Sequence, residues 1–268
     1  MKKKNGFTTQ EMLVIVFMSA TILAILGLVI FANIQGSTKD STKEKEETPS
    51  IPVTPSESET EKSTVEISEF YKTLAYAYIT SVNYGVFSKM YEDPNVSFTD
   101  GTFDGKTYTG TDGTTETIDI YFESANVSDV SLHITNEKVD GGTIVMEGYT
   151  FEVSSDGTIT LIQGETTNTT KVKRSDVALA VAKAYVKSVE YETLVKMYED
   201  PNAIFINGTF DGKTYTSEDG TTIELQITSM AGTPSSVFLT MQSGAISSGT
   251  MTIDGYSIKL NLGIFTLN

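Results

Sequence analysis

The chain has 268 residues and carries 35 acidic against 19 basic side chains, a formal net charge of -16. This excess of acid argues against binding to the phosphate backbone of nucleic acid, which requires clustered Lys and Arg. Cysteine is absent from the sequence, which excludes disulfides, thiolate metal sites and cysteine nucleophiles. The length is compatible with two domains of ordinary size.

The first predicted element is an apolar membrane segment. Residues 12–32, MLVIVFMSATILAILGLVIFA, contain no formal charge and are about as many as a helix needs to cross a bilayer core of roughly 30 Å. Lys2, Lys3 and Lys4 precede the segment, and positive residues stay on the cytoplasmic side, so the C-terminus is expected outside. A cleavable secretory signal would have a shorter apolar region of about 7 to 15 residues and a small-residue cleavage site. The sequence has neither feature, so a transmembrane segment is predicted.

The residues before this segment resemble the leader of type IV prepilins and pseudopilins. The family pattern is a short basic leader, then Gly, Phe, Thr, two variable residues and Glu, followed by an apolar helix. Here Gly6, Phe7, Thr8 and Glu11 stand in that spacing. The resemblance implies that residues 1–6 are the leader, that prepilin peptidase cuts between Gly6 and Phe7, and that Phe7 is then N-methylated.

The same resemblance implies a role for Glu11 in filament assembly. A carboxylate at the start of a membrane span is costly unless it finds a cation. In the family's filaments the corresponding glutamate faces the terminal amine of a neighbouring subunit, here that of Phe7. The alternative is an uncleaved signal anchor in which Glu11 lies in the headgroup region. The transmembrane or filament helix is expected over residues 7–35.

A polar segment follows the anchor. It is rich in Ser, Thr, Glu and Lys and contains Pro49, Pro52 and Pro55. Low hydrophobicity and prolines argue against a packed helix through its middle. We therefore expect a flexible linker over residues 36–66, where a typical pilin would continue its long helix.

The rest of the chain repeats itself at an offset of 107 residues. The motifs KMYEDPN, GTFDGKTYT and DGTT each occur twice, and residues 89–122 match residues 196–229 at 22 of 34 positions. Two copies of one module are predicted, over residues 67–161 and 175–268, with a hinge at residues 162–174.

Each copy is predicted to begin with a helix. Apolar residues recur every three to four positions, as on the buried side of an amphipathic helix. The two stripes are Ile67, Phe70, Leu74, Tyr78, Val82, Val86 and Met90, and Val181, Tyr185, Val189, Leu194 and Met197. Ser175 is expected to cap the second helix, and Asp93-Pro94 and Asp200-Pro201 to end the two helices, because the residue before proline avoids helical geometry. The tyrosine of each KMYEDPN is expected to pack on the sheet.

Short alternating runs separated by Asp-Gly pairs follow each helix and predict hairpins. These pairs are Asp104-Gly105, Asp112-Gly113, Asp156-Gly157, Asp211-Gly212 and Asp219-Gly220. The predicted fold class is therefore α+β: an N-terminal transmembrane helix, a flexible linker, and two repeated modules, each of one helix packed on an antiparallel β-sheet. That order resembles a pilin head, and two such modules resemble the dual-headed pilins of clostridia.

Catalysis finds little support in the sequence. The sole histidine, His133, stands in the alternating stretch VSLHIT and is matched by Thr240 in the second copy, which excludes an imidazole metal site or a Ser-His pair built into both copies. Paired carboxylates of the glycosidase type remain open. Repeated loop aspartates raise the alternative of a calcium site, but the EF-hand spacing is missing and hairpin turns explain them. They are Asp93, Asp104, Asp112, Asp200, Asp211 and Asp219.

The sequence thus predicts a type IV pilin-like filament subunit, a minor pilin that displays two extracellular heads for adhesion. It is not expected to be an enzyme or to hold a cofactor. Its expected partners are other pilin subunits, prepilin peptidase, the membrane before assembly and a surface ligand, and its expected location is the cell membrane and then an extracellular filament. Two alternatives stay open: a pseudopilin of a type II-like secretion or DNA-uptake system, and an unprocessed membrane-tethered binding protein.

Overall fold

The computed structural model describes residues 64–164 and 170–268. The predicted leader and anchor, and nearly all of the predicted linker, lie outside these residues. The chain from Thr64 to Asn268 forms one compact unit.

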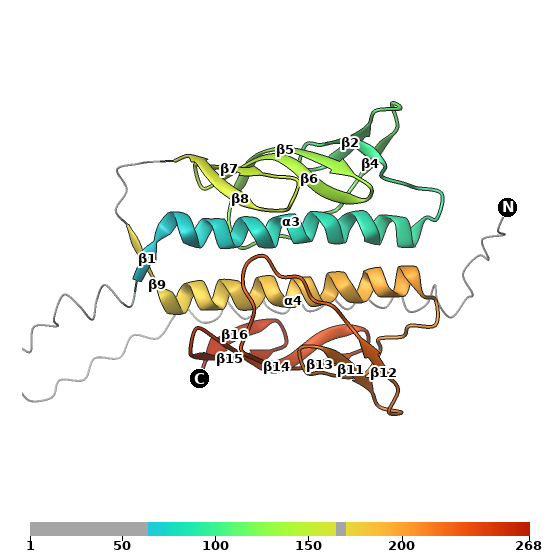
Figure 1. Ribbon diagram of the computed structural model, residues 1–268, viewed down its shortest axis with the longest axis vertical. Coiled ribbons are helices and arrows are strands. Elements are labelled where there is room, and N and C mark those ends of the chain that lie inside the picture. The colour runs from blue at the N-terminus through green and yellow to red at the C-terminus, as the bar shows by residue number, and fades with distance from the viewer. Residues whose placement is uncertain (1–63, 165–169) are drawn as a thin grey trace, which may run out of the picture. The chain divides into compact units, whose positions relative to one another are not determined.

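The same order of elements occurs twice in this unit (Figure 1). The first repeat comprises β1 (Thr64–Glu66), α3 (Ile67–Glu92), β2 (Asp100–Phe103), β3 (Thr107–Gly110), β4 (Thr115–Thr117), β5 (Val127–Thr135), β6 (Lys138–Met146), β7 (Tyr149–Val153) and β8 (Ile159–Gln163). The second comprises β9 (Lys171–Lys173), α4 (Arg174–Glu199), β10 (Gly208–Phe210), β11 (Thr214–Ser217), β12 (Thr222–Glu224), β13 (Ser236–Gln242), β14 (Ala245–Ile253), β15 (Tyr256–Asn261) and β16 (Ile264–Leu267).

The strands after each helix form a seven-stranded antiparallel sheet. The strand orders are β4-β3-β2-β5-β6-β7-β8 and β12-β11-β10-β13-β14-β15-β16. Helix α3 contacts β6, β7 and β8 of its own sheet, and α4 contacts β14, β15 and β16. The two helices also contact each other, so the layers run sheet, helix, helix, sheet (Figure 1).

The repeated motif GTFDGKTYT is a hairpin that supplies core side chains. Phe103 and Tyr108 are each 1% exposed and stand opposite one another on β2 and β3. A Cβ on Gly101 would lie 2.7 Å from the Tyr108 ring, so the tyrosine covers the glycine. Because only glycine leaves that space, the shared scaffold accounts for why both copies keep the motif.

Helix α3 is buried on two opposite sides. Val82 and Val86 belong to the core under the first sheet, whereas Phe87 faces α4. The Phe87 ring centroid lies 5.6 Å from that of Tyr191 and 5.7 Å from that of Tyr198, with both rings edge-on to it. The core of the first repeat therefore extends into the second repeat.

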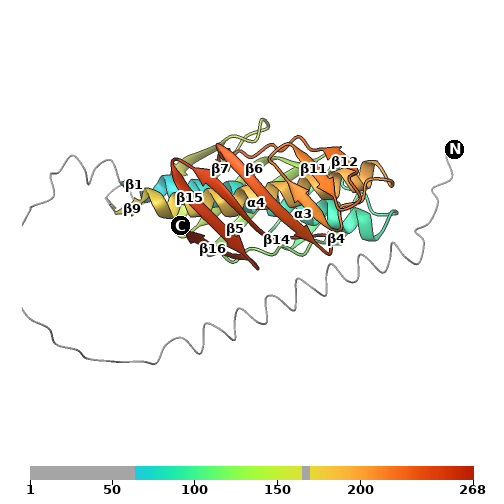
Figure 2. The same ribbon diagram turned by 90° about the horizontal axis from the view of Figure 1, so that it is seen from below.

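Two short strands join the repeats just before the helices. β1 and β9 pair antiparallel, with Thr64 opposite Lys173, Val65 opposite Val172 and Glu66 opposite Lys171. They lie side by side where both helices begin (Figures 1 and 2). Val65 and Val172 are equivalent residues at the offset of 107, so the repeats meet around a local pseudo-twofold axis.

The predicted fold class is wrong for the described residues. They are mostly β, with three antiparallel sheets and two helices, and they form one unit in place of two separate modules. Neither helix in the part of the chain that the structure describes has the length and apolar character needed to cross a membrane. The prediction failed because it assigned each helix one buried side and no partner helix.

The local sequence signals predicted the ends of the two helices correctly but not the start of the second helix. Both helices end before Asp93 and Asp200, which confirms the proline signals. Ser175 is not a cap, because α4 begins at Arg174 and its N-cap is Lys173; β9 leads straight into the helix. Tyr198 contacts Phe87 of α3, a partner on the neighbouring helix that the sequence did not predict.

All five Asp-Gly hairpins are confirmed: they connect β2 to β3, β3 to β4, β7 to β8, β10 to β11 and β11 to β12. Further hairpins were missed, and each has a residue of positive φ other than glycine. These residues are Asn136, Glu137, Glu147, Ser243, Asp254 and Leu262.

Replacing Asn83 by alanine is expected to lower the free energy of unfolding by about 1 to 3 kcal/mol, because a buried donor loses its partner. The Asn83 Oδ1 atom accepts a hydrogen bond of 2.8 Å from the backbone N–H of Val139, and Val139 is 8% exposed. Urea unfolding at pH 7 measures the change. Asn83→Asp keeps the acceptor and is the matched control; equal losses in both variants would contradict the account.

Candidate functional site

The residues predicted to be processed or to assemble, Gly6, Phe7 and Glu11, lie outside the described residues. The loop aspartates are described, and each accepts hydrogen bonds from its own turn. The Asp93 Oδ1 atom accepts the N–H of Asn95 at 3.0 Å, and that of Asp104 accepts the N–H groups of Lys106 and Thr107 at 2.9 and 2.7 Å. The backbone donors hold the pKa of the Asp104 carboxyl below its usual value.

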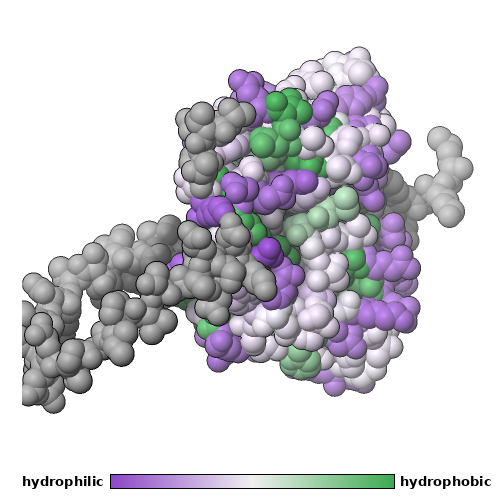
Figure 3. Space-filling model, turned by 60° about the vertical axis from the view of Figure 1, so that its left-hand side comes forward, coloured by the Kyte–Doolittle hydropathy of each residue, from purple (hydrophilic) through white to green (hydrophobic). Residues whose placement is uncertain are grey.

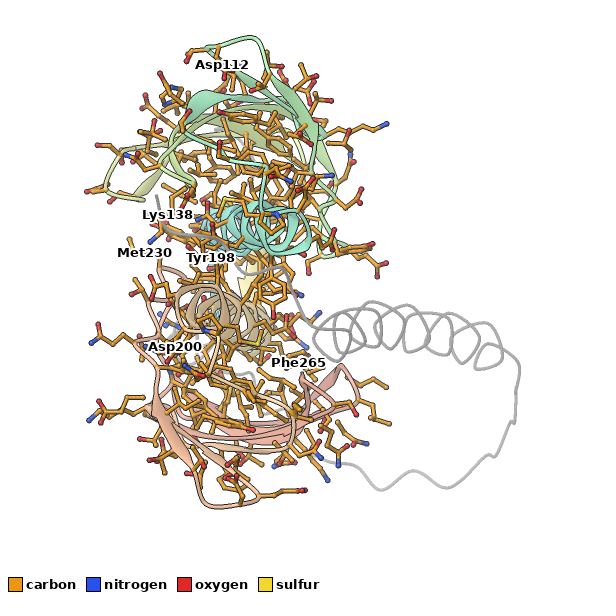
Figure 4. All side chains as sticks on the ribbon, turned by 90° about the vertical axis from the view of Figure 1, so that its right-hand side faces the viewer. Asp112, Lys138, Tyr198, Asp200, Met230 and Phe265 are labelled. Atoms are coloured by element: carbon orange, nitrogen blue, oxygen red, sulfur yellow. The ribbon has the colours of Figure 1, made fainter. Side chains whose placement is uncertain are left out.

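The aspartates do not gather into one site. The second repeat has the same local bonds, at Asp200 to Asn202 and at Asp211 to Lys213. Asp112 and Asp200 lie far apart in Figure 4. Within residues 64–164 and 170–268, no group of three or more His, Asp or Glu side chains is placed to hold a metal ion.

A cluster of polar side chains does gather on the outer face of the first sheet, around His133. On β5, Leu132 and Ile134 are 1% and 0% exposed, so alternation turns His133 outward. Its Nε2 atom lies 2.9 Å from Asp100 Oδ1 on β2, and its Nδ1 atom lies 2.7 Å from Asp140 Oδ1 on β6. The imidazole thus bridges three neighbouring strands.

This geometry favours the imidazolium form of His133. A neutral imidazole has one N–H and can donate to one carboxylate only, whereas the cation donates to both. The hydrogen bond to Asp140 and the charges of Asp140 and Asp100 raise the pKa of His133, and burial opposes them. The side chains of His133, Asp100 and Asp140 are 45%, 51% and 33% exposed. The cluster therefore remains open to proton exchange with solvent.

The cluster is suited to bridging strands and poorly suited to activating a nucleophile. Thr135 Oγ1 lies 3.3 Å from Nδ1 of His133, the same nitrogen that Asp140 occupies at 2.7 Å. With the second nitrogen against Asp100, neither ring nitrogen is free to take a proton from the hydroxyl.

The second repeat has a neutral version of the cluster. Asn207, Thr240 and Ser247 stand at the equivalent positions. Asn207 Oδ1 accepts the N–H of Ser243 at 2.9 Å, and Ser247 Oγ donates to the carbonyl of Thr240 at 3.2 Å. Sequence reasoning placed His133 on a surface strand but missed Asp100 and Asp140. Only the register of β2, β5 and β6 brings the three together, and no local signal carries that register.

Apolar side chains are also exposed, in several small groups (Figure 3). Some belong to the edge strands of the two large sheets, with Leu161 and Ile162 on β8 and Ile264 and Leu267 on β16. On the face visible in Figure 3, apolar residues are interspersed with polar ones. They are too scattered to define a binding groove.

No protein-family model matches this chain, and no match is found among the curated proteins or the solved structures. A function is therefore proposed from the chain's own motifs and geometry.

Proposed function

We propose that the chain is a type IV pilin-like filament subunit, a minor pilin whose Thr64–Asn268 unit is displayed outside the cell for adhesion. The observation that carries this is the leader pattern: Gly6, Phe7 and Glu11 in the family's spacing, directly before 21 uncharged residues at 12–32. Prepilin peptidase would remove residues 1–6 and leave the apolar segment to join other subunits.

Two features of the described unit support display. The chain enters the unit at β1, at the end where both helices begin. The helices end at the opposite end of the unit, where the two KMYEDPN turns follow them (Figure 1). A tether at β1 would therefore present the turns and the outer faces of both sheets to the surroundings.

The state of the N-terminus tests the proposal. Intact-mass and N-terminal peptide analysis of the protein from its native cell is expected to find a chain that starts with methylated Phe7. A chain that starts with Met1 would overturn the proposal in favour of an unprocessed tethered binding protein. A pseudopilin would be processed identically, so cross-linking to partner subunits in intact cells would separate a pilus from a secretion or DNA-uptake system.

Glu11→Ala is expected to leave leader cleavage intact and to reduce incorporation into filaments about tenfold or more. The reason is that the amine of Phe7 would then lie in an apolar packing environment without its carboxylate partner. Immunoblots of sheared filaments and of membrane fractions give the two amounts. Gln10→Ala is the matched control, since that position varies in the family pattern. Equal incorporation of Glu11→Ala and the control would count against pairing of Glu11 with the amine.

A further inference from the structure

The bridge formed by His133 fixes the β5–β6 hairpin close to its turn, two residues before β5 ends at Thr135. Asp100 attaches it to β2, and Asp140 attaches it to β6. At this point the β5–β6 ladder is irregular, with a register shift between His133 and Ile134. A bulge leaves backbone groups unpaired and weakens the ladder locally, so side-chain bonds across it replace part of the strand pairing that is lost here.

The tip of the same hairpin reaches other elements. The N–H groups of Asn136 and Glu137 donate to the carbonyls of Thr99 and Phe98, at 2.7 and 2.8 Å. Val139 donates to Asn83 of α3 at 2.8 Å. The hairpin is therefore held from the loop before β2 and from the first helix.

The tip also lies close to the second repeat. Burial, and then the carboxylate of Glu137, raise the pKa of Tyr198 on α4. Burial raises the pKa of Glu192 on α4, and the ammonium of Lys138 opposes that rise. Val139, next to the tip, belongs to the same buried cluster as Tyr191 and Leu194 of α4. Because His133 lies only three residues from Asn136 in the turn, loosening of its bridge would act at the end of the hairpin that makes this contact between repeats.

We propose that Asp100, His133 and Asp140 form a proton-operated clamp that secures the β5–β6 hairpin, and through its tip the contact with α4, when the imidazole is charged. The charged groups that face the ring are Asp100 from β2 and Asp140 from β6. Its outward neighbours on β5, Ser131 and Thr135, are uncharged, and so are Thr102 and Gly141, which stand opposite it on β2 and β6.

The sign of the pH effect follows from linkage. The pKa of His133 is higher in the folded protein than its ordinary value of 6.5, so the clamp contributes stability in full below that value. The contribution is lost as pH rises through the folded-state pKa. The clamp is thus closed below pH 6.5 and released once the pH has risen above the folded-state pKa of His133.

The proton itself can be followed because His133 is the only histidine in the sequence. An NMR titration of its ring signals is expected to give a midpoint above 6.5 in the intact chain. Asp140→Asn and Asp100→Asn should each titrate at lower pH than the wild type, with the larger change for Asp140. A midpoint that neither substitution moves would overturn the clamp.

The stability effect has a matched control within the chain. Changing Asp100→Asn, His133→Thr and Asp140→Ser together installs the side chains that the second repeat carries at Asn207, Thr240 and Ser247. The wild-type melting temperature is expected to fall by about 2 °C or more between pH 6 and pH 9, as for a partly exposed ion pair in a unit of this size. The melting temperature of this triple variant should fall less over the same pH range. An equal change of melting temperature in the two proteins would overturn the proposal.

Hydrogen exchange tests the link to the second repeat. Between pH 6 and pH 9, after correction for the intrinsic exchange rate, protection is expected to drop in the β5–β6 hairpin and in residues 183–199 of the wild type. The triple variant should show the same protection at both pH values. A drop in protection that is confined to the hairpin would contradict the coupling to α4. No drop in protection in either region would overturn the clamp itself.

Discussion

Replacing Phe87 with alanine is expected to lower the free energy of unfolding of the Thr64–Asn268 unit by about 3 to 5 kcal/mol, the usual cost of truncating a buried aromatic residue. Phe87 is 4% exposed, and its ring meets those of Tyr191 and Tyr198 edge-on. Truncation leaves a cavity between the helices and removes two favourable aromatic pairs. Urea unfolding followed by circular dichroism gives the difference.

The second repeat supplies the control for this change. Leu194 is the equivalent of Phe87 on α4 and is 6% exposed, so a leucine is compatible with this position in the helix. Phe87→Leu also loses the two aromatic pairs, worth about 1 to 3 kcal/mol together, but it keeps most of the buried volume and is therefore expected to cost less than Phe87→Ala. A loss no larger for Phe87→Ala than for Phe87→Leu would mean that the helix contact contributes little to stability.

Gly142→Ala is expected to cost about 3 kcal/mol or more, because it combines backbone strain with a clash. Gly142 has φ of 114°, and a Cβ there would lie 2.1 Å from the carbonyl oxygen of Ser131 on the neighbouring strand. Relief would require β5 and β6 to separate. The equivalent Gly249 has φ of 155° and would place a Cβ 2.3 Å from the oxygen of Phe238, so Gly249→Ala should behave alike.

The adjacent glycine isolates the cause. A Cβ on Gly141 would come no closer than 3.8 Å to its nearest neighbour, the oxygen of Val153. Gly141→Ala is therefore expected to change the free energy of unfolding by no more than about 0.5 kcal/mol. Thermal or urea unfolding of both variants decides the matter, and similar losses at positions 141 and 142 would refute the steric explanation.

Local chemistry made part of the fold predictable. The prolines after Asp93 and Asp200 end both helices, and a carboxylate that bonds to its own turn makes an Asp-Gly pair a hairpin signal. Among the missed hairpins, the one at Asp254-Gly255 has the same Asp-Gly signal and was overlooked. Others have Asn136, Ser243 or Leu262 at positive φ, where few side chains are comfortable and where strand pairing enforces the conformation.

Contacts between distant residues were beyond prediction. The stripe containing Val82 and Val86 revealed one side of α3, whereas Phe87 looked like one more apolar residue until α4 was placed beside it. The same holds for the outer-face cluster. Asp100 and Asp140 are 33 and 7 residues from His133 in the sequence, and only sheet register places a carboxylate against each ring nitrogen.

If the Thr64–Asn268 unit is displayed as proposed, its sheet, helix, helix, sheet layering would determine how it engages more than one partner. The outer faces of the two sheets point away from each other (Figure 1), and they differ in chemistry, with His133 and two aspartates on one and neutral Asn207, Thr240 and Ser247 on the other. Avidity requires that both binding faces reach their targets at once. Two faces that point in opposite directions cannot both contact the same flat surface. Under the proposed adhesive role, such a unit would gain by bridging, with one face toward each of two bodies.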